Sequence, residues 1–135
     1  MESNYYFDFE NKFRGDSSQV SNRFEIYEPL IDNALRGITS PSLLDIGCGR
    51  GEWLKKYKDK FSESIGIESD YSMIQHCRDN GLNVIEGDAI EKLSDFENNS
   101  ISVITMFHVI EHIEHQKLLE LLKACFRILK NDGIL

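Results

Sequence analysis

Short apolar runs alternate with longer segments in which apolar residues recur every three or four positions. Runs typical of buried strands occupy positions 43–46, 64–67, 83–85 and 101–107, and Ile134-Leu135 resembles the start of a fifth. Helical spacing predicts a helix over about 53–60, a second between Asp70 and Asn80, and a long one ending at Asn131-Asp132-Gly133. Strands that alternate with helices indicate βαβ units, so we predict an α/β fold with a parallel sheet and helices on both faces.

The N-terminal part of the chain has a different pattern. Residues 1–20 alternate between polar and aromatic positions and are predicted to form an irregular arm. Residues 21–36 have helical periodicity and form a lead-in, in which Pro29 should either kink the helix or divide it, with Glu28 pushed out of helical geometry. Residues 42–135 are then expected to form the ligand-binding half of a single domain.

Composition narrows the class of protein. A length of 135 residues with 41% hydrophobic positions fits one globular domain. No stretch approaches the roughly 20 apolar residues of a membrane span, and the first six residues lack the features of a secretory signal. The three cysteines are too few for a disulfide framework, so we expect a cytoplasmic protein with free thiols. A net charge of −8 argues against a nucleic-acid partner, which needs clustered Lys and Arg.

A glycine-rich turn between the first strand and its helix is the first candidate ligand site. Gly47, Gly49 and Gly51 allow a tight turn and a close approach of a ligand to the backbone, although a turn without any ligand is the alternative. The spacing differs from the dinucleotide fingerprint, and no Gly-Lys-Ser/Thr of a phosphate loop follows. Asp45 and Glu52 would repel a phosphate and suit a positively charged ligand. S-adenosylmethionine carries a sulfonium and an ammonium group and has no phosphate.

Two further acids follow the second and third predicted strands. Glu68 lies where a carboxylate can accept both ribose hydroxyls of an adenosine, and its alternative is a solvated turn acid. Asp88 could accept the adenine amino group, with the Ala89 backbone N–H on a ring nitrogen. Asp88 can equally cap a short helix over 89–93, and the two roles are compatible.

Taken in order, these elements resemble class I S-adenosylmethionine-dependent methyltransferases. The matching segments are Asp45–Gly51, Glu68, Gly87-Asp88-Ala89, Phe107–His112 and Arg127–Gly133, within about residues 40–135. The resemblance implies a Rossmann-like sheet, S-adenosylmethionine as cofactor and a methyl-transfer activity. The family sheet has seven strands, so we expect the C-terminal strands to be lacking from this chain. The expected cofactor-binding residues are Tyr6, Arg23, Asp45, Gly47, Cys48, Gly49, Gly51, Glu68, Ser69, Asp88, Ala89 and Phe107.

A narrower resemblance is to bacterial methyltransferase domains of O-antigen and polysaccharide biosynthesis. It rests on Lys12–Gly15, Arg23, Gly49–Leu54 and Phe107–His112. It implies that the aromatic arm reaches the cofactor, with Arg23 near the methionine carboxylate. It also implies a surface-polysaccharide glycan or a phosphate as acceptor, whereas a quinone-like phenol or a protein is also compatible. A non-catalytic cofactor-binding or interaction module is the alternative function.

Other side chains complete the chemistry that the sequence predicts. His108 follows the fourth strand and is the candidate general base for a hydroxyl acceptor, or else packs over the cofactor. Glu111 and His115 have metal-ligand spacing, but no third ligand falls at a usable distance, so we expect no metal. Trp53 and Cys48 are expected to pack in the interior. Because strand 101–107 should lose most of its neighbour, we also expect self-association through that side.

Overall fold

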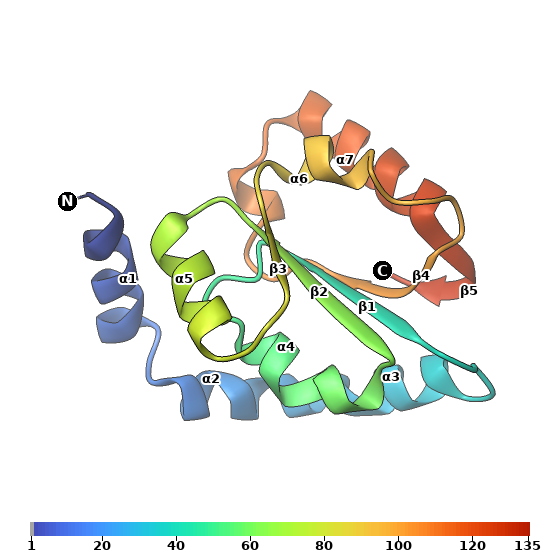
Figure 1. Cartoon of the computed structure of the whole chain (residues 1–135), viewed down its shortest axis with the longest axis horizontal. Helices are drawn as coiled ribbons and strands as arrows, with labels where there is room; N and C mark the ends of the chain where they lie inside the picture. The colour runs from blue at the N-terminus through green and yellow to red at the C-terminus, as the bar shows by residue number, and fades with distance from the viewer. Residues whose placement is uncertain (1) are drawn as a thin grey trace.

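The computed structural model describes the backbone of residues 2–135 and the side chains of residue 5 and residues 7–135. Five strands form one sheet of order β3-β2-β1-β4-β5 in which every neighbouring pair is parallel (Figure 1). The strands are β1 (Ser42–Ile46), β2 (Glu63–Glu68), β3 (Val84–Glu86), β4 (Ile101–Thr105) and β5 (Leu129–Ile134). In this order β1 is the central strand, and β4 lies between β1 and β5.

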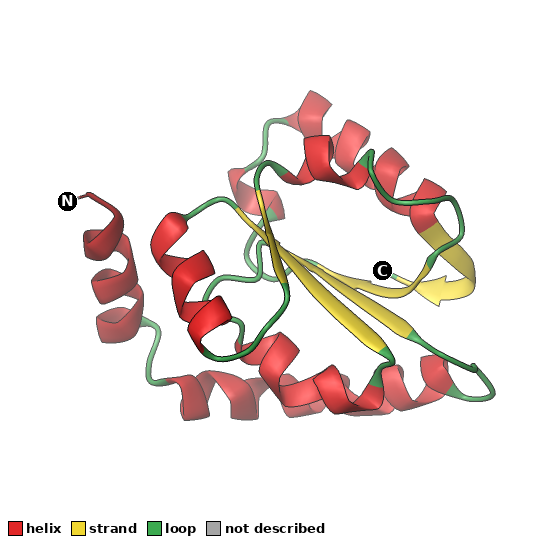
Figure 2. Cartoon of the chain, in the orientation of Figure 1, coloured by secondary structure: helices red, strands yellow, loops and turns green. Residues whose placement is uncertain are grey.

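Helices cover both faces of this sheet (Figure 2). Leu43 of β1 packs in the cluster that includes Ile31 and Leu54, and the next residue, Leu44, packs with Leu121 on the opposite face. This alternation follows from the two-residue period of a strand. The helices are α1 (Glu2–Phe13), α2 (Ser17–Arg23), α3 (Glu28–Leu35), α4 (Glu52–Tyr57), α5 (Tyr71–Asp79), α6 (Ala89–Leu93) and α7 (His115–Ile128), with 3-10 turns η1 (Phe24–Tyr27), η2 (Lys58–Lys60) and η3 (Ile110–His112).

The N-terminal arm is helical, so the expectation of an irregular arm is wrong. An ion pair one helical turn apart, between Glu10 and Arg14, stabilises the end of α1. The ring of Phe7 lies 5.2 Å from that of His76, which packs α1 against α5. Tertiary contacts of this kind order a segment whose own hydrophobic periodicity is weak.

Pro29 divides the helical lead-in, which was one of the two alternatives. It stands in the first turn of α3, where a missing N–H leaves no hydrogen bond unmade. Glu28 keeps helical angles, with φ −57° and ψ −43°, so the expected displacement of this residue is wrong. The 3-10 turn η1 joins α2 directly to α3.

The fifth strand begins earlier than the sequence indicates. β5 starts at Leu129, directly after α7, and contains Asn131-Asp132-Gly133 as an irregular stretch with φ +66° at Asp132. Its pairing with β4 shifts register between Ile101↔Leu129 and Val103↔Ile134. β4 therefore has a hydrogen-bonded neighbour, which contradicts the expectation that it loses most of one.

Candidate functional site

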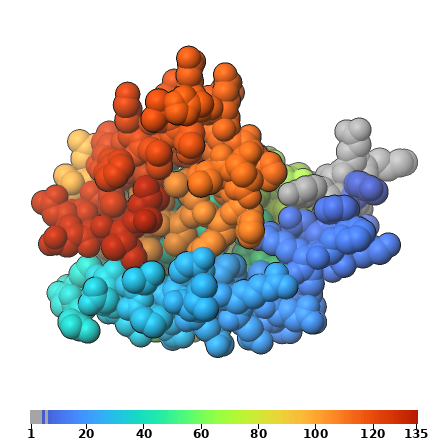
Figure 3. Space-filling view, turned by 180° about the vertical axis from the view of Figure 1, so that it is seen from behind, coloured from blue at the N-terminus to red at the C-terminus, as the bar shows by residue number. Residues whose placement is uncertain are grey.

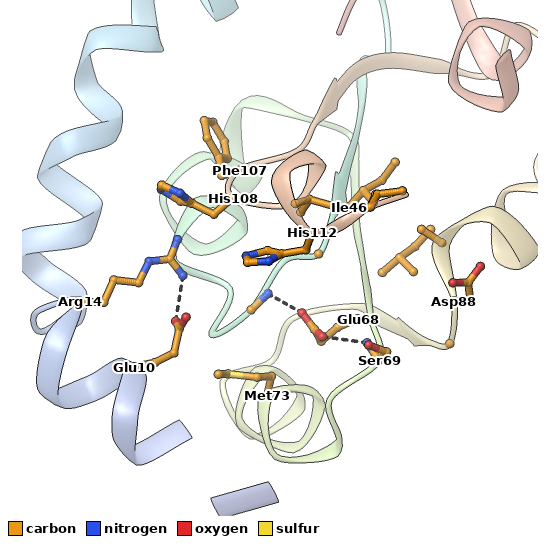
Figure 4. Close-up of a pocket in the computed structure, with 17 residues that line it drawn as sticks. Glu10, Arg14, Ile46, Glu68, Ser69, Met73, Asp88, Phe107, His108 and His112 are labelled. Carbon is orange, nitrogen blue, oxygen red and sulfur yellow. Dashed lines mark hydrogen bonds and ion pairs between the residues drawn. The ribbon is translucent and has the colours of Figure 1, made fainter. Parts of the chain in front are cut away.

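A cavity of about 410 Å³ opens at the carboxyl ends of β1, β2, β3 and β4, near the end of α1 (Figure 4). In a parallel sheet this is the edge where ligands bind. The described residues that line it come from the following segments: Glu10 and Arg14, Ile46-Gly47 and Gly49, Ile67–Ser69 and Met73, Gly87–Ala89, Phe107–Val109, and His112-Ile113.

The glycine turn forms one wall of this cavity. Gly47 and Gly49 line it, and a Cβ on Gly49 would meet nothing within 4 Å, so its backbone is open to a ligand. Gly51 does not line the cavity. It has φ +77°, and a Cβ there would lie 2.4 Å from Leu82 Cδ1, so this glycine serves close packing under α4.

Glu68 is held in place by backbone N–H groups. Its Oε2 accepts a hydrogen bond of 2.9 Å from Gly49 N, and its Oε1 accepts one of 2.8 Å from Ser69 N (Figure 4). Oε1 also accepts a hydrogen bond of 3.0 Å from Asp70 N. Ser69 also lines the cavity. The carboxylate therefore joins the end of β2 to the glycine turn before any ligand arrives.

Asp45 lies beneath the cavity rather than in its lining. Its side chain is buried, and Oδ1 accepts a hydrogen bond of 2.7 Å from Thr105 Oγ1. Burial raises the pKa of Asp45 from 3.8 to about 7, against the opposing effect of the Thr105 hydrogen bond, and the charges of Glu52 and Glu68 add to the rise. Asp45 is therefore not among the residues that line the cavity, and its contact with the cofactor stays a prediction.

Cys48 also packs away from the cavity, behind the turn. A hydrogen bond with Cys77 and burial, followed by the charge of Asp45, raise the pKa of the Cys48 thiol. Cys77 Sγ in turn donates to the carbonyl oxygen of Gly49 at 3.2 Å. All three cysteines are free and buried. Cys48 is thus a packing residue of the turn, as its sequence context predicts.

The cationic side chain at the cavity is Arg14 and not Arg23. Arg14 Nη1 lies 2.8 Å from Glu10 Oε2, and both side chains line the cavity (Figure 4). Arg23 is exposed at the end of α2 and does not line it. The side chain of Tyr6 lies outside the described residues. The sequence contained the signal for Arg14, within Lys12–Gly15, but could not show which arginine faces the cavity.

Arg50 fixes the end of α1 to the glycine turn. Only 3% of this residue is exposed, and its guanidinium donates to Asn11 Oδ1 and, at 3.2 Å, to the carbonyl oxygen of Gly15. Its Nε lies 2.6 Å from Glu52 Oε1 in a buried ion pair. The sequence did not identify this link, because its partners lie more than 30 positions away.

Asp88 and Ala89 reach the cavity at the far end from α1. The Asp88 side chain caps α6 by accepting a hydrogen bond of 3.2 Å from Glu91 N, and both residues line the cavity. The capping role that the sequence predicts is therefore confirmed. Because Asp88 lines the cavity, its second predicted role, accepting the adenine amino group, stays compatible with its position.

The segment after β4 forms the remaining wall. His108 has φ +56°, and its exposed ring has Nδ1 3.4 Å from Glu111 Oε1. His108, His112 and the preceding Phe107 all line the cavity. No group of three His, Cys, Asp or Glu side chains within the described part of the chain is arranged to hold a metal ion.

Phe107 is fixed by an aromatic cluster on the inner side. Its ring centroid lies 4.7 Å from Trp53, 5.0 Å from Phe24 and 5.3 Å from Tyr27. Trp53 is buried in this cluster, which agrees with its predicted interior position. The cluster therefore sets where the chain leaves β4 and enters the cavity wall.

Comparisons with known proteins agree with this architecture. A family model described as a methyltransferase domain matches residues 20–135. A ubiquinone biosynthesis O-methyltransferase of Idiomarina loihiensis is 27% identical over 108 residues, which are 76% of this chain and 44% of that protein. A SAM-dependent methyltransferase structure from Archaeoglobus fulgidus is 38% identical with a TM-score of 0.80, and the match covers 93% of this chain and 54% of that one.

A second solved structure, of a Pyrococcus horikoshii protein, is 28% identical with a TM-score of 0.76 over 96% of this chain and 58% of that one. The fold class predicted from the sequence is thereby confirmed. The chain spans about half the length of these proteins. Within the described residues, no helix is long and apolar enough to cross a membrane.

Proposed function

Because the chain belongs to the methyltransferase-domain family, we propose that it binds S-adenosylmethionine in the cavity at the carboxyl ends of the strands and takes part in methyl transfer to an oxygen acceptor. The observation that carries this proposal is the Glu68 carboxylate, hydrogen-bonded to Gly49 N in a cavity that both residues line. When bound, the cofactor supplies a methyl group that a positively charged sulfur has already activated.

The side chains of the cavity match the chemical groups of this cofactor from one end to the other. Glu68 Oε2 accepts one backbone hydrogen bond, which leaves it capacity for a ribose hydroxyl. Asp88 and Ala89 suit the adenine edge. Arg14 and Glu10 present one positive and one negative group, which complement the carboxylate and the ammonium of the methionine end. A volume of about 410 Å³ is in the range of cofactor sites.

His108 is the residue that we propose as general base. It lines the same cavity, directly after Phe107, and its Nδ1 lies 3.4 Å from Glu111 Oε1. A carboxylate at that nitrogen orients the ring for taking a proton from an acceptor hydroxyl. Phe107 and its aromatic neighbours exclude water from the adjacent wall.

A surface-polysaccharide glycan or phosphate, a role in polysaccharide biosynthesis and a cytoplasmic location all stay predictions from the sequence. The non-catalytic module also keeps this cavity, so cofactor binding does not separate it from an enzyme. An assay with methyl-labelled cofactor and simple phenols or sugars separates the two functions. Transfer of the label that is abolished by His108→Asn supports the enzyme. Cofactor binding without any transfer of the label supports the module.

Calorimetric titration with S-adenosylhomocysteine, the demethylated cofactor, tests the binding proposal. We expect Glu68→Gln to weaken binding about tenfold or more, because a charged acceptor is lost. Glu63→Gln, at the other end of the same strand, is the matched control and should bind as the natural chain does. NADH should give no heat. A folded chain that binds no S-adenosylhomocysteine at high concentration would refute the proposal.

A further inference from the structure

A second cavity adjoins the proposed cofactor site on the inner side of Phe107. It has a volume of about 240 Å³ and lies between α3, the start of α4 and the ends of β4 and β5. Leu30, Trp53, Met106 and Ile134 are among its lining residues, and Phe107 lines both cavities. From behind, the N-terminal segment in blue and the C-terminal segment in orange to red lie against one another (Figure 3).

The chemistry of this second cavity is apolar and aromatic. None of the described side chains that line it carries a charge, and the hydroxyl of Thr105 is already bonded to Asp45. The rings of Tyr27 and Phe107 lie 6.0 Å and 4.7 Å from that of Trp53. Such a wall favours a flat ring by stacking and edge contacts. It disfavours a phosphate or a sugar, whose several polar groups would lose water and find few partners there.

The size of the cavity fits the same class of ligand. An apolar cavity of about 150 Å³ is enough to bind benzene, so a volume of about 240 Å³ accommodates one substituted aromatic ring. The indole N–H of Trp53 is buried without a hydrogen-bond partner among the described residues. Buried donors are normally satisfied, so a polar atom of a ligand is one group that could pair with it.

We infer that this cavity binds the aromatic ring of a phenolic acceptor. The inference rests on the proposed function, since it takes the neighbouring cavity as the cofactor site. Phe107 lines both cavities, and His108, which follows it directly, lines only the cofactor side. A ring seated against Phe107 therefore has its hydroxyl end near the wall that carries the proposed base. The carboxyl ends of β4 and β5 provide this position, as expected for ligands of parallel sheets.

Trp53 provides a direct readout, because it is the only tryptophan of the chain. We propose titration of the full chain with p-cresol, followed by the fluorescence of Trp53, with methyl glucoside as the comparison ligand. Leu30→Glu introduces a carboxylate at an exposed position in the cavity lining and should weaken p-cresol binding about tenfold or more. Ile26→Glu is the matched control, since Ile26 is exposed nearby and does not line the cavity.

Several outcomes would overturn the inference. It fails if p-cresol leaves Trp53 unchanged, if Leu30→Glu binds p-cresol as tightly as Ile26→Glu, or if methyl glucoside binds with the same dependence on Leu30. If Leu30→Glu does not fold, Leu30→Ala serves instead, with a smaller loss of about threefold from the lost apolar contact. An oligomer that Leu30→Glu dissociates would identify a second copy as the occupant. S-adenosylhomocysteine titration of the same samples separates the two proposals, because cofactor binding without p-cresol binding refutes this inference alone.

Discussion

Asp45→Asn should make the protein more stable at neutral pH, although it removes a buried hydrogen-bonded carboxyl. Burial raises the pKa of Asp45 from 3.8 to about 7, and the nearby charges of Glu52 and Glu68 act in the same direction. Each pKa unit corresponds to about 1.4 kcal/mol, so the linked change in the free energy of unfolding is on the order of 4 kcal/mol. That change is a large fraction of the free energy of unfolding of a typical domain, which is about 5–15 kcal/mol.

The sign follows from proton binding. Between about pH 4 and pH 7 the folded chain holds the Asp45 proton and the unfolded chain releases it, so stability falls as the pH rises through that window. Asparagine carries no charge at any of these pH values and can still accept the hydrogen bond from Thr105 Oγ1. The variant should therefore match the natural chain near pH 4 and exceed it by a few kcal/mol near pH 8.

Urea unfolding at a series of pH values measures this difference directly. Asp59 is an exposed acid in η2, so Asp59→Asn is the control. Its effect on the free energy of unfolding should be small and the same at every pH. If Asp45→Asn loses stability relative to the natural chain as the pH rises, the carboxylate is held by its partners rather than penalised by burial. The conclusion that burial raises the pKa of Asp45 would then be wrong.

Three further predictions concern α1 and the sheet edge. Arg14→Gln should weaken S-adenosylhomocysteine binding about tenfold in calorimetry, whereas Arg23→Gln should leave it unchanged. If only Arg23→Gln weakens binding, Arg23 is the cofactor-binding arginine, as the sequence predicted. Arg50→Gln leaves the Glu52 charge buried and unpaired, so unfolding should cost about 3–5 kcal/mol less and trypsin should cut α1 faster. Sedimentation at micromolar concentration should show self-association through the edge formed by β5, and a monomer would contradict it.

The sequence by itself determined the local elements of the cofactor-binding half. Short apolar runs located the strands, and apolar positions every three or four residues located most helices, because each pattern reflects which faces of a single element are buried. The caps at Asp70 and Asp88 were predictable for the same reason, since each carboxylate bonds N–H groups only two or three positions away. The glycine turn and Glu68 follow from strand ends that a parallel sheet necessarily brings together.

The tertiary structure alone decided which side chains face the cavity. Arg14 lines the cavity and Arg23 does not, because Arg50, far away in the sequence, bonds the residues around the end of α1. Asp45 is in the motif and yet lies beneath the cavity, where burial and not spacing sets its charge. Contacts between distant segments depend on how whole elements pack, and a pattern of neighbouring residues contains no information about that packing.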